Sequence, residues 1–252
     1  MTPSFAHPKC FARDLGDCSR KISKEHFISR GLMAMIGAAS ASTLRGPAWL
    51  GTEERRIPTK SLASGVLCDA HNSQLSPLDA AMIAFVGHLT GTHRQDGVLE
   101  VDGFSIERWF LKAEQGFLAS GYAHKQLKGR SASTPVLDIL FRGRQLAERC
   151  GLYFLSGSHE DEKNALGLFP LRGPEPMSVA GIAVLISGFP FLFLPIPPWS
   201  ELVRSLAALR LHYRPRAINI RHGRHEREVR TGWSTGEVVE IDVSGPFSGR
   251  SP

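Results

Sequence analysis

The sequence is poor in cysteine and lacks the apolar run of a secretory signal. Four cysteines in 252 residues are too few for the disulfide framework of a secreted protein of this length. The N-terminus, MTPSFAHPKCFARDLGD, has no apolar core, so we expect no signal peptide. The C-terminal half contains no P-loop, dinucleotide fingerprint or nucleophile triad. We therefore expect a protein of a reducing compartment, the cytoplasm.

One long uncharged stretch, from Met177 to Pro198, has the length needed to span a bilayer. It contains four prolines and a break at Ser187-Gly188, and both features interrupt a helix. The stretch therefore predicts two buried strands around a turn instead of a membrane helix. We expect no association with a membrane.

The overall charge favours an anionic partner. The net charge is +6 and the pI is near 9.4, which suits nucleic acid but identifies no site. The stretch from Arg204 to Arg230 contains eight arginines against two glutamates. Two interpretations stay open for it: the arginines could neutralise phosphates, or they could lie on a solvated strand and loop face with local ion pairs.

Helices are predicted in the middle of the chain. Ser76-Pro77 indicates a helix start, because Pro suits the first turn and Ser can cap it. Apolar residues at helical spacing predict a second helix over Gly103 to Leu118, and further helices are predicted over Pro135 to Cys150 and over 201–213.

After Cys150 the sequence turns to short apolar or alternating runs bounded by Gly and Pro, which predict strands. The fold class predicted is therefore α+β. We expect an N-terminal unit over residues 1–89, a helical segment over 90–150 and a β-rich region over 151–252.

Potential metal ligands concentrate in two stretches, Cys10 to Leu32 and Leu67 to Asp79. The Cys-x2-His spacing of Cys68 and His71 lets two side chains bind one metal from a tight turn. A longer loop can supply the other two ligands, Cys10 and Cys18. Three thiolates and one imidazole would form a closed tetrahedral site that suits structural zinc. The alternative is a set of buried, reduced cysteines without a metal.

The same stretches contain the dipeptide Glu25-His26 and, directly after His71, Asn72. A carboxylate and an amide oxygen suit Mg²⁺ or Mn²⁺, and a histidine can act as a general base near neutral pH. If Glu25 and Asn72 bind a divalent ion while His26 activates water, phosphodiester cleavage follows. The alternative is that Glu25 and His26 are surface residues.

The sequence SKEHFISRGL followed by LCDAHNSQLSPLD resembles the HNH, or His-Me finger, endonucleases. Members have an acid–His near the end of a first strand, a long loop, and a second segment, often C-x2-C-N, that leads into a helix. Many carry a structural zinc around this ββα-metal unit. The resemblance covers residues 10–85, about a third of the chain. It implies a zinc-stabilised endonuclease that hydrolyses DNA.

On this resemblance, His26 takes the place of the general base and Asn72 that of the Asn at the catalytic ion, with Glu25 beside it. The first zinc pair corresponds to Cys10 and Cys18, and the second to Cys68 and His71. The chain departs from the family in its C-x7-C spacing, in His71 where Cys is usual and in Glu25 where Asp is frequent. Asp79 is either a second acidic group or a residue of a helix's first turn.

Four basic residues flank Glu25-His26 and are predicted to contact a nucleic-acid backbone beside the cut, namely Arg20, Lys21, Lys24 and Arg30. Two other interpretations stay open. The chain could be a non-catalytic, zinc-stabilised module that binds nucleic acid or protein, or an enzyme that works through its C-terminal half. The choice between DNA and RNA and the oligomeric state are not predicted.

Overall fold

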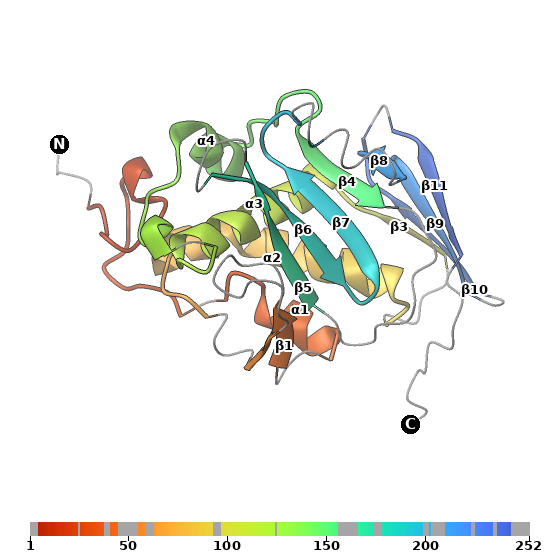
Figure 1. Ribbon diagram of the computed structural model, residues 1–252, viewed down its shortest axis with the longest axis horizontal. Coiled ribbons are helices and arrows are strands. Elements are labelled where there is room, and N and C mark those ends of the chain that lie inside the picture. Colours follow the sequence, from red (N-terminus) through yellow and green to blue (C-terminus); the bar gives the residue numbers. More distant parts are fainter. Residues whose placement is uncertain are drawn as a thin grey trace.

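The computed structural model describes residues 5–24, 26–37, 41–44, 55–58, 63–92, 97–123, 125–155, 166–173, 178–198, 202, 210–222, 225–233 and 236–242. These residues form a mixed α+β fold, which confirms the predicted class. Two long helices, α2 (Asp69–Leu89) and α3 (Gly103–Ala119), lie side by side and pack on one face of a five-stranded sheet (Figure 1).

The five-stranded sheet is antiparallel, in the order β5-β6-β7-β4-β8. In chain order its strands are β4 (Gly151–Leu155), β5 (Leu166–Arg172), β6 (Val179–Ile186), β7 (Phe189–Leu194) and β8 (Leu211–Tyr213). The long uncharged stretch thus forms two largely buried strands, β6 and β7, joined at Ser187-Gly188, as predicted. None of the described helices is long and apolar enough to cross a membrane.

A four-stranded sheet mixes parallel and antiparallel pairs in the order β11-β9-β10-β3. Its strands are β3 (Gly97–Glu100), β9 (Ala217–His222), β10 (His225–Arg230) and β11 (Val238–Asp242). Strand β3 lies in the segment 90–150, which is predicted to be helical. Because β3 pairs with β10, this segment also contributes a strand to the four-stranded sheet. Described arginines here make local pairs, Arg230 with Glu228 at 2.7 Å and Arg221 with Glu226 at 3.6 Å. These pairs favour the solvated-face interpretation for Arg221 and Arg230, whereas Arg214 and Arg227 of the same stretch are largely buried.

The N-terminal part contains short elements: η1 (Arg13–Leu15), α1 (Arg30–Met35), β1 (Ala41–Leu44) and β2 (Arg55–Pro58). Two extended segments run antiparallel to each other, with bridges between Ile22 and Cys68 and between His26 and Ala63. Helix α2 follows directly on the second segment. This order is compatible with the predicted ββα unit, whose assignment to the HNH family stays a prediction.

Helix α2 begins at Asp69, so the predicted start at Ser76-Pro77 is wrong. Pro77 lies inside the helix and has no N–H to donate to the carbonyl of Ser73. The hydroxyl of Ser76 donates to that carbonyl at 2.8 Å instead, which satisfies the acceptor that the proline leaves. A side chain thus allows the helix to continue through a residue that usually begins one.

The second predicted helix is confirmed as α3, whose N-terminal N–H groups of Phe104 and Ser105 donate to the Asp102 carboxylate. The third, α4 (Thr134–Arg142), ends before its predicted limit because Gly143 adopts a left-handed φ of 70°. A short 3₁₀ helix, η3 (Lys125–Leu127), precedes it. Most of the helix predicted within 201–213 lies outside the described residues, and its last three residues form β8.

One cluster of buried side chains includes residues from all three predicted parts, from Cys10 to Ile241. Phe110 on α3 packs on two phenylalanines of β7, with ring centroids 5.4 Å from Phe191 and 6.0 Å from Phe193. These contacts fix α3 against the sheet. The boundaries near residues 89 and 150 stay predictions.

Glu114 on α3 is 1% exposed, and its Oε2 has no hydrogen-bond partner among the described residues. Burial raises its pKa from 4.5 to about 8, so the folded protein keeps a proton that the unfolded chain releases above pH 4.5. Stability is therefore lost as the pH rises between these values. We expect Glu114→Gln to stabilise the protein by about 2 kcal/mol at pH 6 and about 3 kcal/mol at pH 7.

Urea unfolding at both pH values measures this gain. The matched control is Glu226→Gln, which changes an exposed carboxylate on β10 and should leave stability nearly unchanged at both pH values. A gain for Glu114→Gln that does not grow with pH would contradict the assignment of a buried, protonated Glu114.

Candidate metal centre and adjoining cavity

The start of α2 positions two of the four predicted zinc ligands. Cys68 is the N-cap residue and His71 lies in the first turn, so both side chains face the same side of the helix end. The N–H of Asp69 donates to the carbonyl of Lys21, and the N–H of Ser23 donates to that of Leu67. These bonds tie the helix start to the segment that follows Cys18.

The other two ligands lie in a compact loop around η1. Gly16 and Asp17 both have positive φ, 76° and 52°, and this turn brings the chain back so that Cys18 lies close to Cys10. The N–H of Phe11 donates to the carbonyl of Val66 at 2.8 Å, which holds the loop against the residue that precedes the second stretch. Hydrogen bonds of the backbone therefore bring both predicted pairs together.

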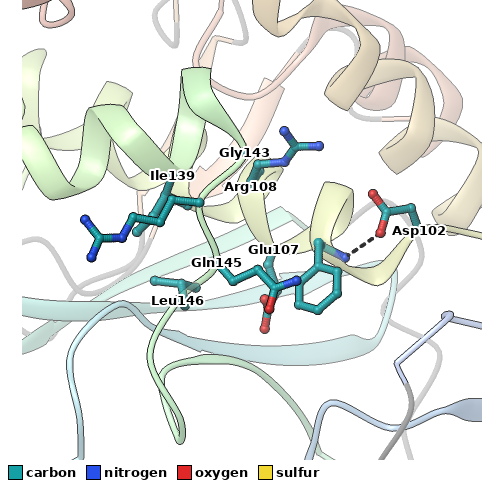
Figure 2. A pocket seen from close by; sticks show the side chains of 9 residues that line it. Asp102, Glu107, Arg108, Ile139, Gly143, Gln145 and Leu146 are labelled. Carbon is teal, nitrogen blue, oxygen red and sulfur yellow. Dashed lines mark hydrogen bonds between the residues drawn. The ribbon is translucent and has the colours of Figure 1, made fainter.

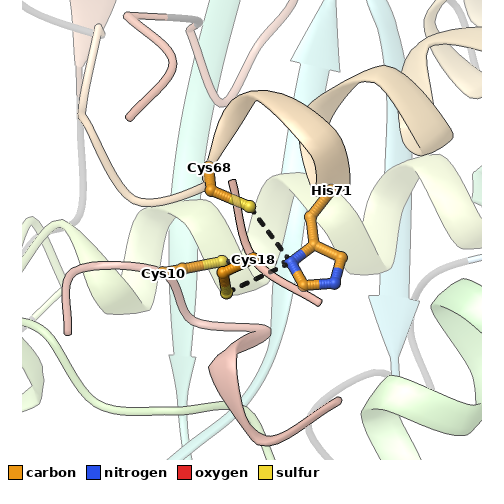
Figure 3. A group of neighbouring side chains, drawn as sticks. All are labelled: Cys10, Cys18, Cys68 and His71. Carbon is orange, nitrogen blue, oxygen red and sulfur yellow. Dashed lines mark hydrogen bonds between the residues drawn. The ribbon is translucent and has the colours of Figure 1, made fainter. Parts of the chain in front are cut away.

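Three sulfurs surround one nitrogen in this cluster (Figure 3). The Nδ1 atom of His71 lies 3.4 Å from the Sγ of Cys10, 3.7 Å from that of Cys18 and 3.3 Å from that of Cys68. All four ligand atoms lie within 4.8 Å of one another, and all four residues are buried. Tetrahedral zinc would separate sulfur and nitrogen ligands by about 3.6 Å, given usual bond lengths. The donor set and its spacing thus fit a metal such as zinc.

The groups of the cluster differ in acidity. Burial raises the pKa of the Cys10 thiol to about 12 and also raises that of Cys18. At Cys68 burial acts in the same direction, but the N–H groups of His71 and Ser19 outweigh it and lower the pKa. Burial lowers the pKa of His71, which favours the neutral ring that binds metals. A bound cation would favour the thiolate form of all three cysteines.

A small cavity brings together two of the predicted catalytic residues, His26 and Asn72. The other residues that line it are Phe11, Ser23, Phe27, Ser64, Val66, Leu67, Lys112 and Gly116. His26 is half-buried and pairs with Ala63, and Asn72 follows a ligand of the metal cluster. The third predicted residue, Glu25, lies outside the described residues.

Helix α3 reaches this cavity because Gly116 has no side chain. A Cβ atom there would lie only 2.4 Å from the Cβ of Phe27, so a larger residue would push the helix away. One turn earlier, Lys112 is 3% exposed and its Nζ contacts the Asp79 carboxylate at 2.5 Å. Asp79 also accepts from Trp109 Nε1 at 3.0 Å and so links α2 to α3. Because α2 begins at Asp69, the alternative that Asp79 lies in the helix's first turn is wrong, and its role as a second acidic group stays a prediction.

No local pattern in the sequence marks Lys112 or Ser64 as residues of this cavity. Lys112 lies in a helix, where a charged side chain is expected to face solvent. It also lies outside residues 10–85, which carry the family resemblance. The four basic residues predicted to contact a backbone are all exposed: Arg20, Lys21, Lys24 and Arg30. Lys21 pairs with Asp69 at 3.3 Å.

The predicted divalent-ion site near Asn72 depends on Glu25. Among the described residues of its lining, Asn72 and two serines have side-chain oxygens that could bind a metal ion, and none has a carboxylate. In the part of the chain that the structure describes, the group of potential metal ligands that lie close together is the Cys3His cluster. Binding of Mg²⁺ or Mn²⁺ therefore stays a prediction.

A second, larger cavity of about 200 Å³ lies between the start of α3 and the end of α4 (Figure 2). Its charged residues have partners, although the buried Nε atom of Arg108 has none among the described residues. Asp102 caps α3, and Glu107 accepts from both Arg214 and the N–H of Leu152. Arg108 and Glu107 point in opposite directions in Figure 2. This cavity therefore has no converging catalytic set among the described residues.

Comparisons with known proteins add no family or relative to this geometry. No protein-family model, no curated protein and no solved structure matches the chain.

Proposed function

We propose that the chain is a metal-dependent endonuclease of the HNH type that hydrolyses phosphodiester bonds of DNA. The observation that supports this most strongly is the cavity that His26 and Asn72 both line. In the sequence, residues of this cavity neighbour ligands of the Cys3His cluster in both stretches. A general base and an amide oxygen at one cavity are the groups that the proposal requires. The net charge of +6 suits an anionic substrate.

In the proposed reaction His26 takes a proton from the attacking water while the water oxygen bonds to phosphorus. The bond from phosphorus to the leaving oxygen breaks, and that oxygen takes a proton from solvent. Asn72 and Glu25 would bind Mg²⁺ or Mn²⁺, which supplies charge stabilisation at the scissile phosphate. The exposed basic residues beside His26 would hold the backbone in register.

The Cys3His cluster has a structural role in this proposal. Its four ligands would bind zinc in a closed site with no open position for substrate. Zinc would fix the loop around η1 to the start of α2 and so keep His26 and Asn72 at one cavity.

Nicking of plasmid DNA in Mg²⁺ or Mn²⁺ tests the proposal. We expect His26→Ala to reduce the cleavage rate by about 10² to 10⁴, the usual contribution of a general base. The matched control is His225→Ala, which removes an exposed histidine of β10 and should leave cleavage unchanged. Equal cleavage by wild type and His26→Ala would show that His26 is not the base.

The alternative is a zinc-stabilised module that binds nucleic acid or protein without cutting. It is favoured by the Cys3His cluster, which could stabilise the fold whether or not His26 acts as a base. Under this alternative, Cys68→Ala disrupts binding while His26→Ala leaves it unchanged. Binding without any cleavage, by wild type in either ion, would favour the module.

A further inference from the structure

We infer that the cavity beside His26 and Asn72 is an oxygen-sized anion site, in which Lys112 and Ser64 bind a non-bridging oxygen of the nucleic-acid backbone. This inference rests on the proposed nucleic-acid substrate, but not on cleavage. It assigns a role to two residues outside the motifs that suggest the function.

The size of the cavity limits what can enter it. Its volume is about 10 Å³. A water molecule needs about 10–15 Å³ by a comparable measure, so the cavity can accept one oxygen atom of water or of a phosphate. A whole phosphate group would stay outside, with one oxygen inserted.

Two residues of the lining, Lys112 and Ser64, carry hydrogen-bond donors that such an oxygen could accept. Lys112 carries three N–H donors and contacts Asp79 with one of them, which leaves two for a ligand. The hydroxyl of Ser64 is buried and has no hydrogen-bond partner among the described residues. A buried hydroxyl without a partner is costly unless a ligand or water satisfies it.

The charged residue in the described lining is Lys112, whose ammonium group pairs with Asp79. Asp79 is not part of the lining, and its two oxygens accept from Trp109 and Lys112. Lys112 is therefore part of the lining, while its partner Asp79 is not. A nearly buried ammonium in a site that excludes water interacts with an anion more strongly than an exposed one does.

Binding of a labelled DNA duplex at several salt concentrations, to zinc-loaded full-length protein without added Mg²⁺ or Mn²⁺, tests the inference. The variants are Lys112→Met, which keeps length but removes charge, and Asp79→Asn, which keeps Lys112 and can still accept from Trp109. We expect Lys112→Met to reduce the slope of log affinity against log salt by about 1, while Asp79→Asn leaves it unchanged. The surface control Lys125→Met should also leave the slope unchanged.

Cleavage in Mn²⁺ gives a second readout. We expect Lys112→Met to lower kcat by about 10²-fold and Ser64→Ala to lower it less, with both variants folded by circular dichroism. The double variant Asp79→Asn/Lys112→Met removes both charges and so separates function from folding: it should fold normally and cut as slowly as Lys112→Met.

The outcomes separate this inference from the proposed function. A lower slope for Lys112→Met without cleavage by any variant supports the anion site and contradicts the nuclease. Cleavage by wild type with unchanged slope and kcat in folded Lys112→Met supports the nuclease and overturns the anion site. Failure of wild type to bind DNA overturns both. If Asp79→Asn and Lys112→Met lowered the slope equally, Lys112 would act only as the structural partner of Asp79, and the inference would be overturned.

Discussion

Cys68→Ala is expected to lose the bound zinc and to lower the melting temperature by about 10 °C or more. The physical reason is that Cys68 contributes a ligand from the N-cap position of α2, so its loss frees the helix start from the loop around η1. Small zinc domains draw about 10–16 kcal/mol of apparent free energy from the metal at neutral pH, so one missing ligand should cost several kcal/mol. Metal analysis and thermal unfolding of the same sample measure both effects.

Cys150→Ala is the matched control, because Cys150 is also buried and reduced but lies outside the cluster. It should keep its zinc and lose only about 1 kcal/mol, the usual cost of a small core change. Similar losses of stability in the two variants, with zinc retained in both, would show that the cluster does not stabilise the fold through a metal.

Glu107→Ala should destabilise the protein by about 3–5 kcal/mol, because it leaves the Arg214 charge without its partner in a largely buried site. Glu107 is 2% exposed and accepts from Arg214 at 2.8 Å and 3.0 Å, and from the N–H of Leu152 at 2.9 Å. Burial raises the pKa of Glu107, while Arg214 and Leu152 act in the opposite direction. Gly151 permits this contact, because a Cβ there would lie 2.0 Å from the carboxylate. Urea unfolding gives the free energy.

Glu226→Ala is the control for the ion pair, since Glu226 is exposed and pairs with Arg221 at 3.6 Å. Its loss should cost under about 1 kcal/mol. The double variant Glu107→Met/Arg214→Met should recover much of the stability that Glu107→Ala loses, because it removes both charges. A Glu107→Ala variant as stable as Glu226→Ala would mean that this buried pair does not hold α3 to the sheet.

Features encoded by short-range spacing could be predicted from the sequence. Cys68 and His71 are three residues apart, and the strands β6 and β7 meet at a Ser-Gly turn. In both cases neighbouring residues carry the whole signal. The convergence of the first cysteine pair on the second could also be anticipated, because a buried thiol cluster needs partners of metal-ligand type.

Features that depend on partners from distant elements could not be predicted. Lys112 is buried because Asp79 on α2 pairs with it, and Glu107 because Arg214 does so from beyond β8. Neither pairing can be detected from the local periodicity of the sequence, because a charged residue on a helix is expected to face solvent. The start of α2 could not be predicted for a different, local reason, because the Ser76 hydroxyl compensates for Pro77 within the helix.

We propose that Cys10, Cys18, Cys68 and His71, whose ligand atoms lie within 4.8 Å of one another, form one four-ligand zinc centre that joins the two stretches. Metal analysis of the full chain, purified under reducing conditions and then loaded with Co²⁺, tests it most directly. We predict one zinc per chain, replaced by cobalt that shows thiolate-to-metal charge transfer and the strong visible bands of a tetrahedral site. A chain that is folded, contains no zinc and produces no such spectrum with cobalt would contradict the claim.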